Sequence, residues 1–394
     1  MPKFLALTSR GLNEALQEEL VQANFKNVEV HPDVVTFEGS WAEAYRAHAV
    51  TRIATRILYP VLDFTCYNEE DLYHNIFKRH DFTQYIKPDQ TFEVEAHVRE
   101  HRHLRDQRFV AMKTKDAIAD QFRKKFDQRP SVAHGDQATM RVVVRVVRTM
   151  ASIAIDLTGD SLSHRGYRSQ SGEAPLRENI AAALVRYSGW TPDVPLVDPF
   201  CGSGTILIEA ALAALNLGPT IHPRSYLYQK LLNYKATDWP APVKAELEAP
   251  LQLFGFDEDE RVLQKARANA QAAGVAKYIR FERCAVKDLK CPSKTPGFVI
   301  TNPPYGERIG SKDSVHSAMK EFASSLKTDF DKWQAWILSG DSEATASLKL
   351  KAERKIPVWN GSIECRFLRY SIRGKSGSPL RTEVPGNTPG QSED

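Results

Sequence analysis

The sequence predicts an α/β protein whose C-terminal half forms a doubly wound, largely parallel sheet, preceded by two smaller α/β units. Three observations support this prediction. Apolar strands alternate with amphipathic helices from Val194 onward, a glycine-rich turn joins the first of these strands to its helix, and a basic region precedes them. A chain of 394 residues is also too long to fold around one compact core, so several domains are expected.

The first 60 residues predict a small α+β unit. Apolar residues form a short strand over 3–7 and recur at helical spacing over 12–20. A hairpin is expected over 28–37, around His31-Pro32-Asp33, followed by a second amphipathic helix over 41–57.

Residues 61–160 continue the alternation, with strands expected over 91–96, 140–148 and 151–157 and a helix over 109–126. From residue 97 to 148 there are 13 Lys or Arg and 6 Asp or Glu, so the local surplus exceeds the +4 of the whole chain. Either a solvated basic face or a surface that grips nucleic acid explains this surplus. The candidate nucleic-acid contacts here are Lys113, Arg123, Lys124, Arg141 and Arg145.

Residues 161–175 are polar, contain two glycines and predict an interdomain linker. A catalytic domain is expected over 176–372, opening with a helix after Pro175, and the Gly-, Ser- and Pro-rich tail 373–394 is expected to be disordered. Within this domain the pattern predicts strands and helices that alternate: strands over 195–198, 253–257, 279–281, 298–301 and 336–339, and helices over 205–217 and 260–273, the latter ending at Gly274.

A glycine-rich turn, Asp198-Pro-Phe-Cys-Gly-Ser-Gly-Thr205, lies between a strand and a helix. Its glycines let the backbone turn sharply and approach a ligand. The turn lacks G-x-G-x-x-G and the Gly-Lys-Ser/Thr that cradles phosphates, so a nucleoside with an amino-acid tail, S-adenosylmethionine, fits it better than a pyrophosphate does. The candidate cofactor contacts in this turn are Asp198, Pro199, Cys201, Gly202, Ser203, Gly204 and Thr205.

Carboxylates follow the next two strands. Asp257 and Glu258 end the second strand, where a carboxylate can bind both ribose hydroxyls, and Asp288 follows the third, where it can accept from an adenine amino group. A lone Asp at a strand end is usually a turn or helix cap. Because ligands of open α/β sheets bind along the carboxyl edge, three such positions in order favour a nucleoside cofactor.

The tetrapeptide Asn302-Pro303-Pro304-Tyr305 follows the fourth strand. An exocyclic base amine is a poor nucleophile, and two acceptors at its N–H groups, the Asn302 side-chain oxygen and the Pro303 carbonyl, would orient it for methylation. The two prolines fix the backbone, and Tyr305 offers a face on which the base can stack. A rigid turn that closes a strand is the alternative. By itself the motif does not separate guanine from adenine, or RNA from DNA.

Features of the sequence as a whole argue against membrane-spanning, secreted and metal-binding proteins. No run of 18 apolar residues is present, and the N-terminus lacks the pattern of a signal peptide, so a cytoplasmic protein is expected. The five cysteines form no C-x-x-C pair, so we expect free thiols and no metal site.

The motifs resemble those of bacterial ribosomal RNA guanine-N2 methyltransferases that carry a THUMP domain: Leu162-Ser-His-Arg-Gly-Tyr-Arg168, Ala174-Pro-Leu-Arg-Glu178, the turn 198–205 and the tetrapeptide. The resemblance implies a ferredoxin-like unit, a THUMP RNA-binding domain and a Rossmann-like class I methyltransferase domain that uses S-adenosylmethionine to form N2-methylguanosine in large-subunit (23S) ribosomal RNA. It places Arg165 and Arg168 between domains, as candidate RNA contacts.

The chain departs from some members of this family, which carry a second methyltransferase domain, so one methylation is expected. Three alternatives stay open: methylation of adenine N6 in DNA, methylation of guanine N2 in transfer RNA, and an RNA-binding assembly factor without catalysis.

Overall fold

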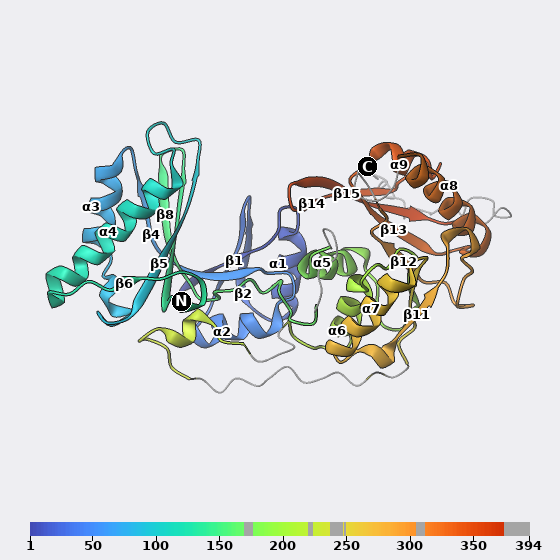
Figure 1. Cartoon of the computed structure of the whole chain (residues 1–394), viewed down its shortest axis with the longest axis horizontal. Helices are drawn as coiled ribbons and strands as arrows, with labels where there is room; N and C mark the ends of the chain where they lie inside the picture. The colour runs from blue at the N-terminus through green and yellow to red at the C-terminus, as the bar shows by residue number, and fades with distance from the viewer. Residues whose placement is uncertain (169–175, 220–223, 237–246, 248–249, 305–311, 374–394) are drawn as a thin grey trace, which may run out of the picture.

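The computed structural model describes residues 1–168, 176–219, 224–236, 247, 250–304 and 312–373. Its elements form two sheets that lie side by side, the N-terminal sheet on the left of Figure 1 and the C-terminal sheet on the right. The expected α/β fold class is confirmed. Among the described residues, no helix is long and apolar enough to cross a membrane.

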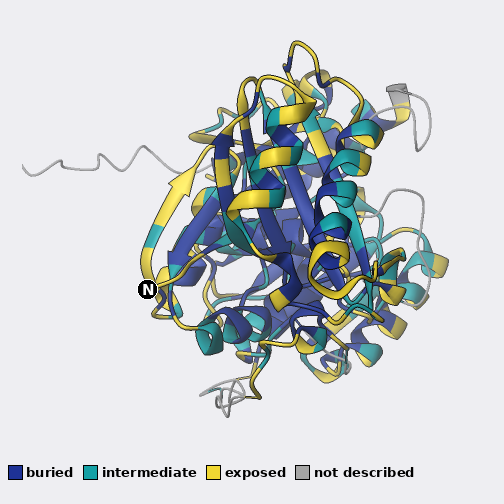
Figure 2. Cartoon of the chain, turned by 90° about the vertical axis from the view of Figure 1, so that its left-hand side faces the viewer, coloured by how far each residue is buried: buried dark blue, intermediate teal, exposed yellow. Residues whose placement is uncertain are grey.

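The N-terminal sheet has the strand order β2-β3-β1-β4-β8-β7-β5-β6. Its strands are β1 Lys3–Leu7, β2 Lys26–His31, β3 Val34–Glu38, β4 Arg56–Thr65, β5 Thr91–Arg99, β6 Ser131–Val132, β7 Met140–Val147 and β8 Met150–Asp156. Its helices are α1 Asn13–Gln22, α2 Trp41–Val50, α3 Glu69–Arg79 and α4 Gln107–Phe126. In Figure 2 buried residues follow most of the strands, whereas exposed residues lie on the loops and on the outward faces of the helices. The two edge strands, β2 and β6, are mostly exposed.

Two boundaries differ from the sequence-based expectation. Helix α2 begins at a capping box formed by Ser40 and Glu43 but ends at Val50, because Thr51 is extended; the expected helix over 41–57 was too long. The expected domain boundary at residue 60 lies inside β4, which pairs with β1 on one side and β8 on the other. The two N-terminal units therefore share one continuous sheet.

The C-terminal sheet has the order β11-β10-β9-β12-β13-β15-β14. Its strands are β9 Leu196–Asp198, β10 Leu253–Asp257, β11 Ile279–Arg283, β12 Phe298–Thr301, β13 Gln334–Ser339, β14 Arg354–Asn360 and β15 Ile363–Ser371. The described helices are α5 Glu178–Ser188, α6 Thr205–Ala214, α7 Glu260–Ala272, α8 Lys312–Asp329 and α9 Ser342–Ala346. The first five strands are parallel, as expected, and the hairpin β14–β15, which the sequence did not predict, adds two antiparallel strands.

The order of the strands reverses at β9, since β10 and β11 lie on one side of it and β12 and β13 on the other. Open α/β sheets bind ligands at such a switch point, outside the carboxyl ends of the strands. The helix after β10 ends as expected: Gly274 has a φ of +71° and follows the last turn of α7.

The two halves meet where α1 packs against α5 (Figure 1). The Tyr187 hydroxyl donates to the Gly11 carbonyl at 2.9 Å, and the Asn179 amide donates to the Ser9 hydroxyl at 3.0 Å. Trp359 lies on the C-terminal hairpin, and the Arg10 guanidinium of the N-terminal unit lies 4.0 Å from the centre of its ring. These contacts dock the N-terminal unit directly on the C-terminal unit.

Candidate active site

The candidate site lies at the carboxyl edge of the C-terminal sheet, where the turn 198–205 joins β9 to α6. Gly202 and Gly204 have φ values of +52° and +82°, a backbone region that residues with a side chain rarely adopt. A Cβ on Gly204 would lie 3.0 Å from the Phe281 ring, so this glycine is needed for packing as well as for the turn. The turn therefore depends on its two glycines.

Neighbouring strands hold the turn in place. The Gly202 N–H donates to the Asp257 carboxylate at 3.1 Å, and the Cys201 N–H donates to the Phe256 carbonyl at 2.9 Å. From α7, the Asn269 amide donates to the Ser203 carbonyl at 3.0 Å. Two predicted cofactor positions, the turn and Asp257, are thus in direct contact.

Asp198 connects the turn to the tetrapeptide. Its Oδ1 accepts from the Phe200 N–H at 3.2 Å and from the Thr301 hydroxyl at 2.7 Å. Since Thr301 directly precedes Asn302, one carboxylate joins the candidate cofactor turn to the candidate catalytic segment. Thr301 was not among the predicted site residues, although its place at the end of an apolar strand, directly before the tetrapeptide, was a usable signal.

Burial dominates the electrostatics of this site. Asp198 is fully buried, and desolvation raises the pKa of its carboxyl to about 7, with a further upward contribution from Asp257. Desolvation also raises the pKa of Asp257 and that of the Cys201 thiol. The site therefore contains carboxylates that a positively charged ligand would stabilise in their ionised form.

The remaining cofactor candidates lie at the same edge in different environments. Pro199 and Thr205 are buried in the turn. Glu258 is exposed directly after β10, and Asp288 is exposed in the short 3-10 helix Val286–Asp288 that follows β11. Neither exposed carboxylate has a side-chain hydrogen bond to another described residue. Both remain free to bind a ligand.

Asn302 carries the most informative atom of the tetrapeptide. Its Oδ1 is buried and accepts no hydrogen bond from the described residues. A buried acceptor without a donor costs about 1–3 kcal/mol, so such an atom calls for a ligand that donates. Pro303 is buried beside it, Pro304 is partly buried, and Tyr305 lies outside the described residues.

Arg141 and Arg165, both expected at an RNA surface, are buried instead. Arg141 donates to the carboxylates of Glu93 at 2.9 Å and Asp156 at 3.1 Å. The Arg165 side chain is fully buried and pairs with Glu209, which is also fully buried, at 3.3 Å. These positions correct the expectation for both arginines, because a buried, paired guanidinium stabilises the fold and is not available to a phosphate.

The other cationic candidates differ in exposure. Arg123 and Lys124 are exposed in the last turn of α4, whereas Lys113 and Arg145 are part-exposed and paired with Glu69 and Asp33. Arg168, also expected near RNA, lies against the candidate cofactor turn, where it donates to the Thr205 hydroxyl at 2.9 Å.

Among the described residues, one group of side chains has the composition of a metal site. His316, Asp341 and Glu343 place their ligand atoms within 4.8 Å of one another beyond the end of β13. Asp341 already caps α9 by accepting from the Glu343 and Ala344 N–H groups. We assign Asp341 this capping role.

Family models match three consecutive parts of the chain. The RlmL ferredoxin-like domain matches residues 3–58, the THUMP domain matches 66–156, and the RMKL-like methyltransferase domain matches 165–369. The expected family resemblance is confirmed.

Individual relatives and solved structures are similar to this chain over most of its length. A ribosomal RNA large subunit methyltransferase K/L of Syntrophotalea carbinolica is 34% identical over 94% of this chain, which spans about half (53%) of that relative's length. The crystal structure of SMU.472, a methyltransferase candidate complexed with SAH, is 27% identical with a TM-score of 0.83, covering 96% of this chain and 99% of that one. A protein from Listeria monocytogenes described as an N6-adenine-specific DNA methylase is 26% identical with a TM-score of 0.82, covering 94% of this chain and 96% of that one.

Proposed function

Because this chain belongs to the family defined by the RMKL-like methyltransferase domain, we propose that it transfers a methyl group from S-adenosylmethionine to an exocyclic amine of an RNA base, with guanine N2 of large-subunit ribosomal RNA as the target. The observation that carries this proposal is the buried Asn302 Oδ1, which lacks a donor among the described residues and lies beside the cofactor turn. The K/L relative supports the choice of RNA.

The residues present fit the cofactor. The turn 202–204 would lie against its amino-acid portion, Asp257 would accept from the ribose hydroxyls, and Asp288 is placed for the adenine amino group. When bound, S-adenosylmethionine supplies a methyl group on a positively charged sulfur. The complex of SMU.472 with SAH, the product of such a transfer, supports this assignment.

The target amine would donate its two N–H groups to the Asn302 Oδ1 and the Pro303 carbonyl. These contacts orient the nitrogen lone pair along the line of attack, which is where most of the rate gain arises. The nitrogen forms a bond to the methyl carbon, the carbon–sulfur bond breaks, and its electron pair stays on sulfur. The nitrogen then loses a proton to solvent, so no strong base is needed before attack.

The pKa of Asp198 predicts how cofactor affinity depends on pH. A cationic cofactor favours the ionised carboxylate and so lowers the Asp198 pKa from about 7 on binding, which releases a proton. Affinity for S-adenosylmethionine should therefore rise as the pH increases up to about 7 and level off above it. Titration calorimetry between pH 5.5 and 8.5 measures this, with Asp198→Asn as the control expected to show a weaker dependence on pH, because only Asp257 of the two buried carboxylates then remains. A flat profile for the unmodified chain would contradict the role given to Asp198.

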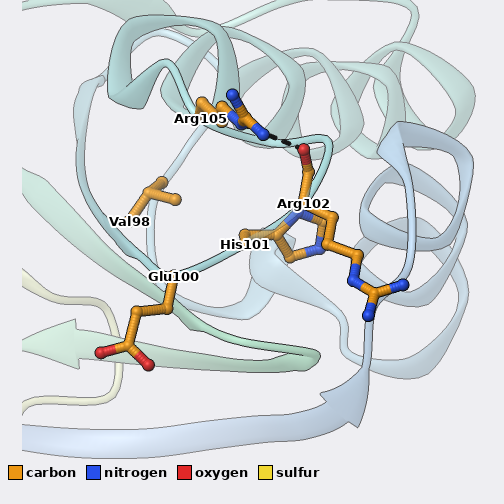
Figure 3. Close-up of a pocket in the computed structure, with 5 residues that line it drawn as sticks. All are labelled: Val98, Glu100, His101, Arg102 and Arg105. Carbon is orange, nitrogen blue, oxygen red and sulfur yellow. Dashed lines mark hydrogen bonds between the residues drawn. The ribbon is translucent and has the colours of Figure 1, made fainter.

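For the RNA backbone we place the contact on the loop between β5 and α4. Four exposed arginines recur at every third residue from the end of β5 to the start of α4, a spacing visible in the sequence but missed: Arg99, Arg102, Arg105 and Arg108. A cavity of about 450 Å³ opens beside them (Figure 3), lined by Val98, Glu100, His101, Arg102 and Arg105. Among the described residues, no carboxylate pairs with Arg102 or Arg105.

An aromatic ring adjoins this loop. The His101 ring contacts the Cys66 carbonyl at 3.0 Å, and the residue that follows Cys66 in the chain is Tyr67, which is 61% exposed. Phosphates bound by arginines and a base stacked on tyrosine are the usual elements of single-strand RNA contacts.

Replacing Arg102 and Arg105 together with alanine should weaken RNA binding and lower the slope of log affinity against log salt by about 1.4, because each phosphate contact contributes about 0.7. Fluorescence anisotropy with a labelled 20-nucleotide RNA of mixed sequence measures both quantities. Arg261 and Arg280, exposed arginines of the catalytic unit, provide the matched double-alanine control. An unchanged slope in the loop variant would exclude this surface.

The proposed activity is tested directly with the purified chain and labelled S-adenosylmethionine. Label is expected in large-subunit ribosomal RNA that lacks its own modifications, and on guanine N2 after digestion to nucleosides. Transfer to duplex DNA, with adenine labelled, would favour the activity named for the Listeria protein instead. Absence of transfer to either would contradict the proposal.

A further inference from the structure

An unusually long connection leaves the C-terminal unit between α6 and β10 and packs on the N-terminal unit. In an open α/β sheet the connection between a helix and the next strand usually takes about 2–6 residues, whereas here it runs from residue 215 to residue 252. We call residues 224–236 of this connection, which the structure describes, the crossing segment. Its Tyr228 N–H donates at 3.0 Å to the carbonyl of Leu157, directly after β8, and the segment lies beside α2 in Figure 1.

Stacked rings anchor the crossing segment on α2. The Tyr228 ring stacks on the Tyr45 ring, with 4.3 Å between the centroids and 18° between the planes. On its own segment Tyr228 also stacks on Tyr226 at 5.3 Å, and the Tyr226 ring lies 4.9 Å from that of His48. All four side chains are buried, so the segment is packed into the N-terminal unit and does not merely lie along its surface.

The crossing segment also reaches the THUMP domain. The Lys230 Nζ donates to the carbonyl of Asp136 at 2.7 Å and to that of Ala138 at 3.2 Å. The Leu232 N–H donates to the Tyr85 carbonyl at 2.9 Å. The docking contacts of α5 and the C-terminal hairpin, by contrast, involve the ferredoxin-like domain. The crossing segment therefore ties the C-terminal unit to both N-terminal domains.

These contacts fix the THUMP domain relative to the carboxyl edge of the C-terminal sheet, where Asn302 follows β12. The proposed RNA contact on the loop between β5 and α4 then lies at a set separation from the candidate catalytic segment. A misplacement of about 1 Å at a reacting group can lower a rate by about 100-fold, so this separation matters for the reaction. We propose that the crossing segment, through Tyr228 and Lys230, determines which guanine of the bound RNA is methylated, an inference that rests on the proposed function.

The position of the methyl group separates this role from a contribution to stability alone. The full chain is incubated with unmodified large-subunit ribosomal RNA, and mass spectrometry of ribonuclease fragments locates each N2-methylguanosine. The original chain should methylate one guanine. Tyr228→Ala should lower methylation of that guanine by up to about 100-fold and place methyl groups on other guanines. Lys230→Ala, which leaves the stacked rings in place, should have the same effect to a smaller extent.

Two variants serve as controls. Tyr228→Phe keeps the stacked ring and should methylate the original guanine. Asn233 is exposed in the same segment and has no hydrogen bond to another described residue, so Asn233→Ala should leave the methylated position unchanged. Affinity for S-adenosylhomocysteine, measured by calorimetry, should be the same in every variant. If thermal unfolding shows that Tyr228→Ala does not fold, Lys230→Ala provides the test, because its side chain is part-exposed.

The distribution of product decides between the two roles. A loss in equal proportion at every guanine would show a structural role alone and overturn the inference, as would an unchanged position in both the Tyr228→Ala and the Lys230→Ala proteins. Failure of the original chain to methylate this RNA would instead contradict the proposed function, and this inference with it.

Discussion

Replacing Asn302 with alanine is expected to lower kcat by about 10²- to 10³-fold, the usual effect of removing one hydrogen-bonding group aimed at the reacting atoms. The Asn302 Oδ1 is buried and accepts from no described residue, so its removal leaves no donor of a described residue unpaired. Folding should therefore be unaffected. Single-turnover methylation of unmodified large-subunit RNA measures the loss.

Two controls separate catalysis from binding. Calorimetry should give the unmodified affinity for S-adenosylhomocysteine in Asn302→Ala, because the Asp198–Thr301 contact that links the segments involves another residue. Asn302→Asp keeps an acceptor oxygen and should retain more activity than the alanine variant. A fully active Asn302→Ala protein would remove the tetrapeptide from the mechanism, and RNA binding without catalysis would become the better account.

Replacing Arg165 with alanine is expected to lower the free energy of unfolding by about 3–5 kcal/mol, because it leaves the buried Glu209 carboxylate unpaired. The substitution also removes or disturbs hydrogen bonds to other segments. The Arg165 guanidinium donates to the carbonyls of Leu162 and Arg52, and the Tyr167 hydroxyl donates to the same Glu209 carboxylate at 3.3 Å. Chemical denaturation measures the effect.

Removing both charges is the informative control. The double variant Arg165→Met/Glu209→Leu should lose less than the sum of the single variants, since it leaves no buried charge without a partner. Arg366→Ala breaks an exposed pair with Glu364 and should cost at most about 1 kcal/mol. A loss at Arg165 no greater than at Arg366 would show that the buried pair does not hold the units together.

Much of the candidate site follows from sequence periodicity. Strands that alternate with helices become parallel neighbours, so residues at the strand ends meet at one edge, as Asp198, Asp257 and Asn302 do. Glycines in the turn were predictable because the positive φ of Gly202 and Gly204 is a local requirement. These features depend on the chain's own pattern and need no knowledge of distant partners.

The surroundings of charged side chains were not predictable in this way. Arg141 occupies the strand face expected from alternation, yet that face is covered by carboxylates of two neighbouring strands, Glu93 on β5 and Asp156 on β8. Arg165 meets Glu209 on a helix 44 residues further along the chain. Which charges pair depends on topology, which a charge count along the sequence does not contain.

The arginine-rich loop was missed for a related reason. The basic surplus was assigned to α4 and β7, whereas two further exposed cations without a carboxylate partner among the described residues, Arg102 and Arg105, lie in the connection between β5 and α4. Total charge indicated a basic region correctly, but only the paired or unpaired state of each side chain indicates which cations remain available.

The most direct measurement of the central claim is nucleoside mass spectrometry on separated RNA pools from cells with and without this protein. The account predicts that large-subunit ribosomal RNA loses N2-methylguanosine, that transfer RNA is unchanged, and that a copy carrying Asn302→Ala fails to restore the nucleoside. Unchanged ribosomal RNA nucleosides in cells that lack the protein would contradict it.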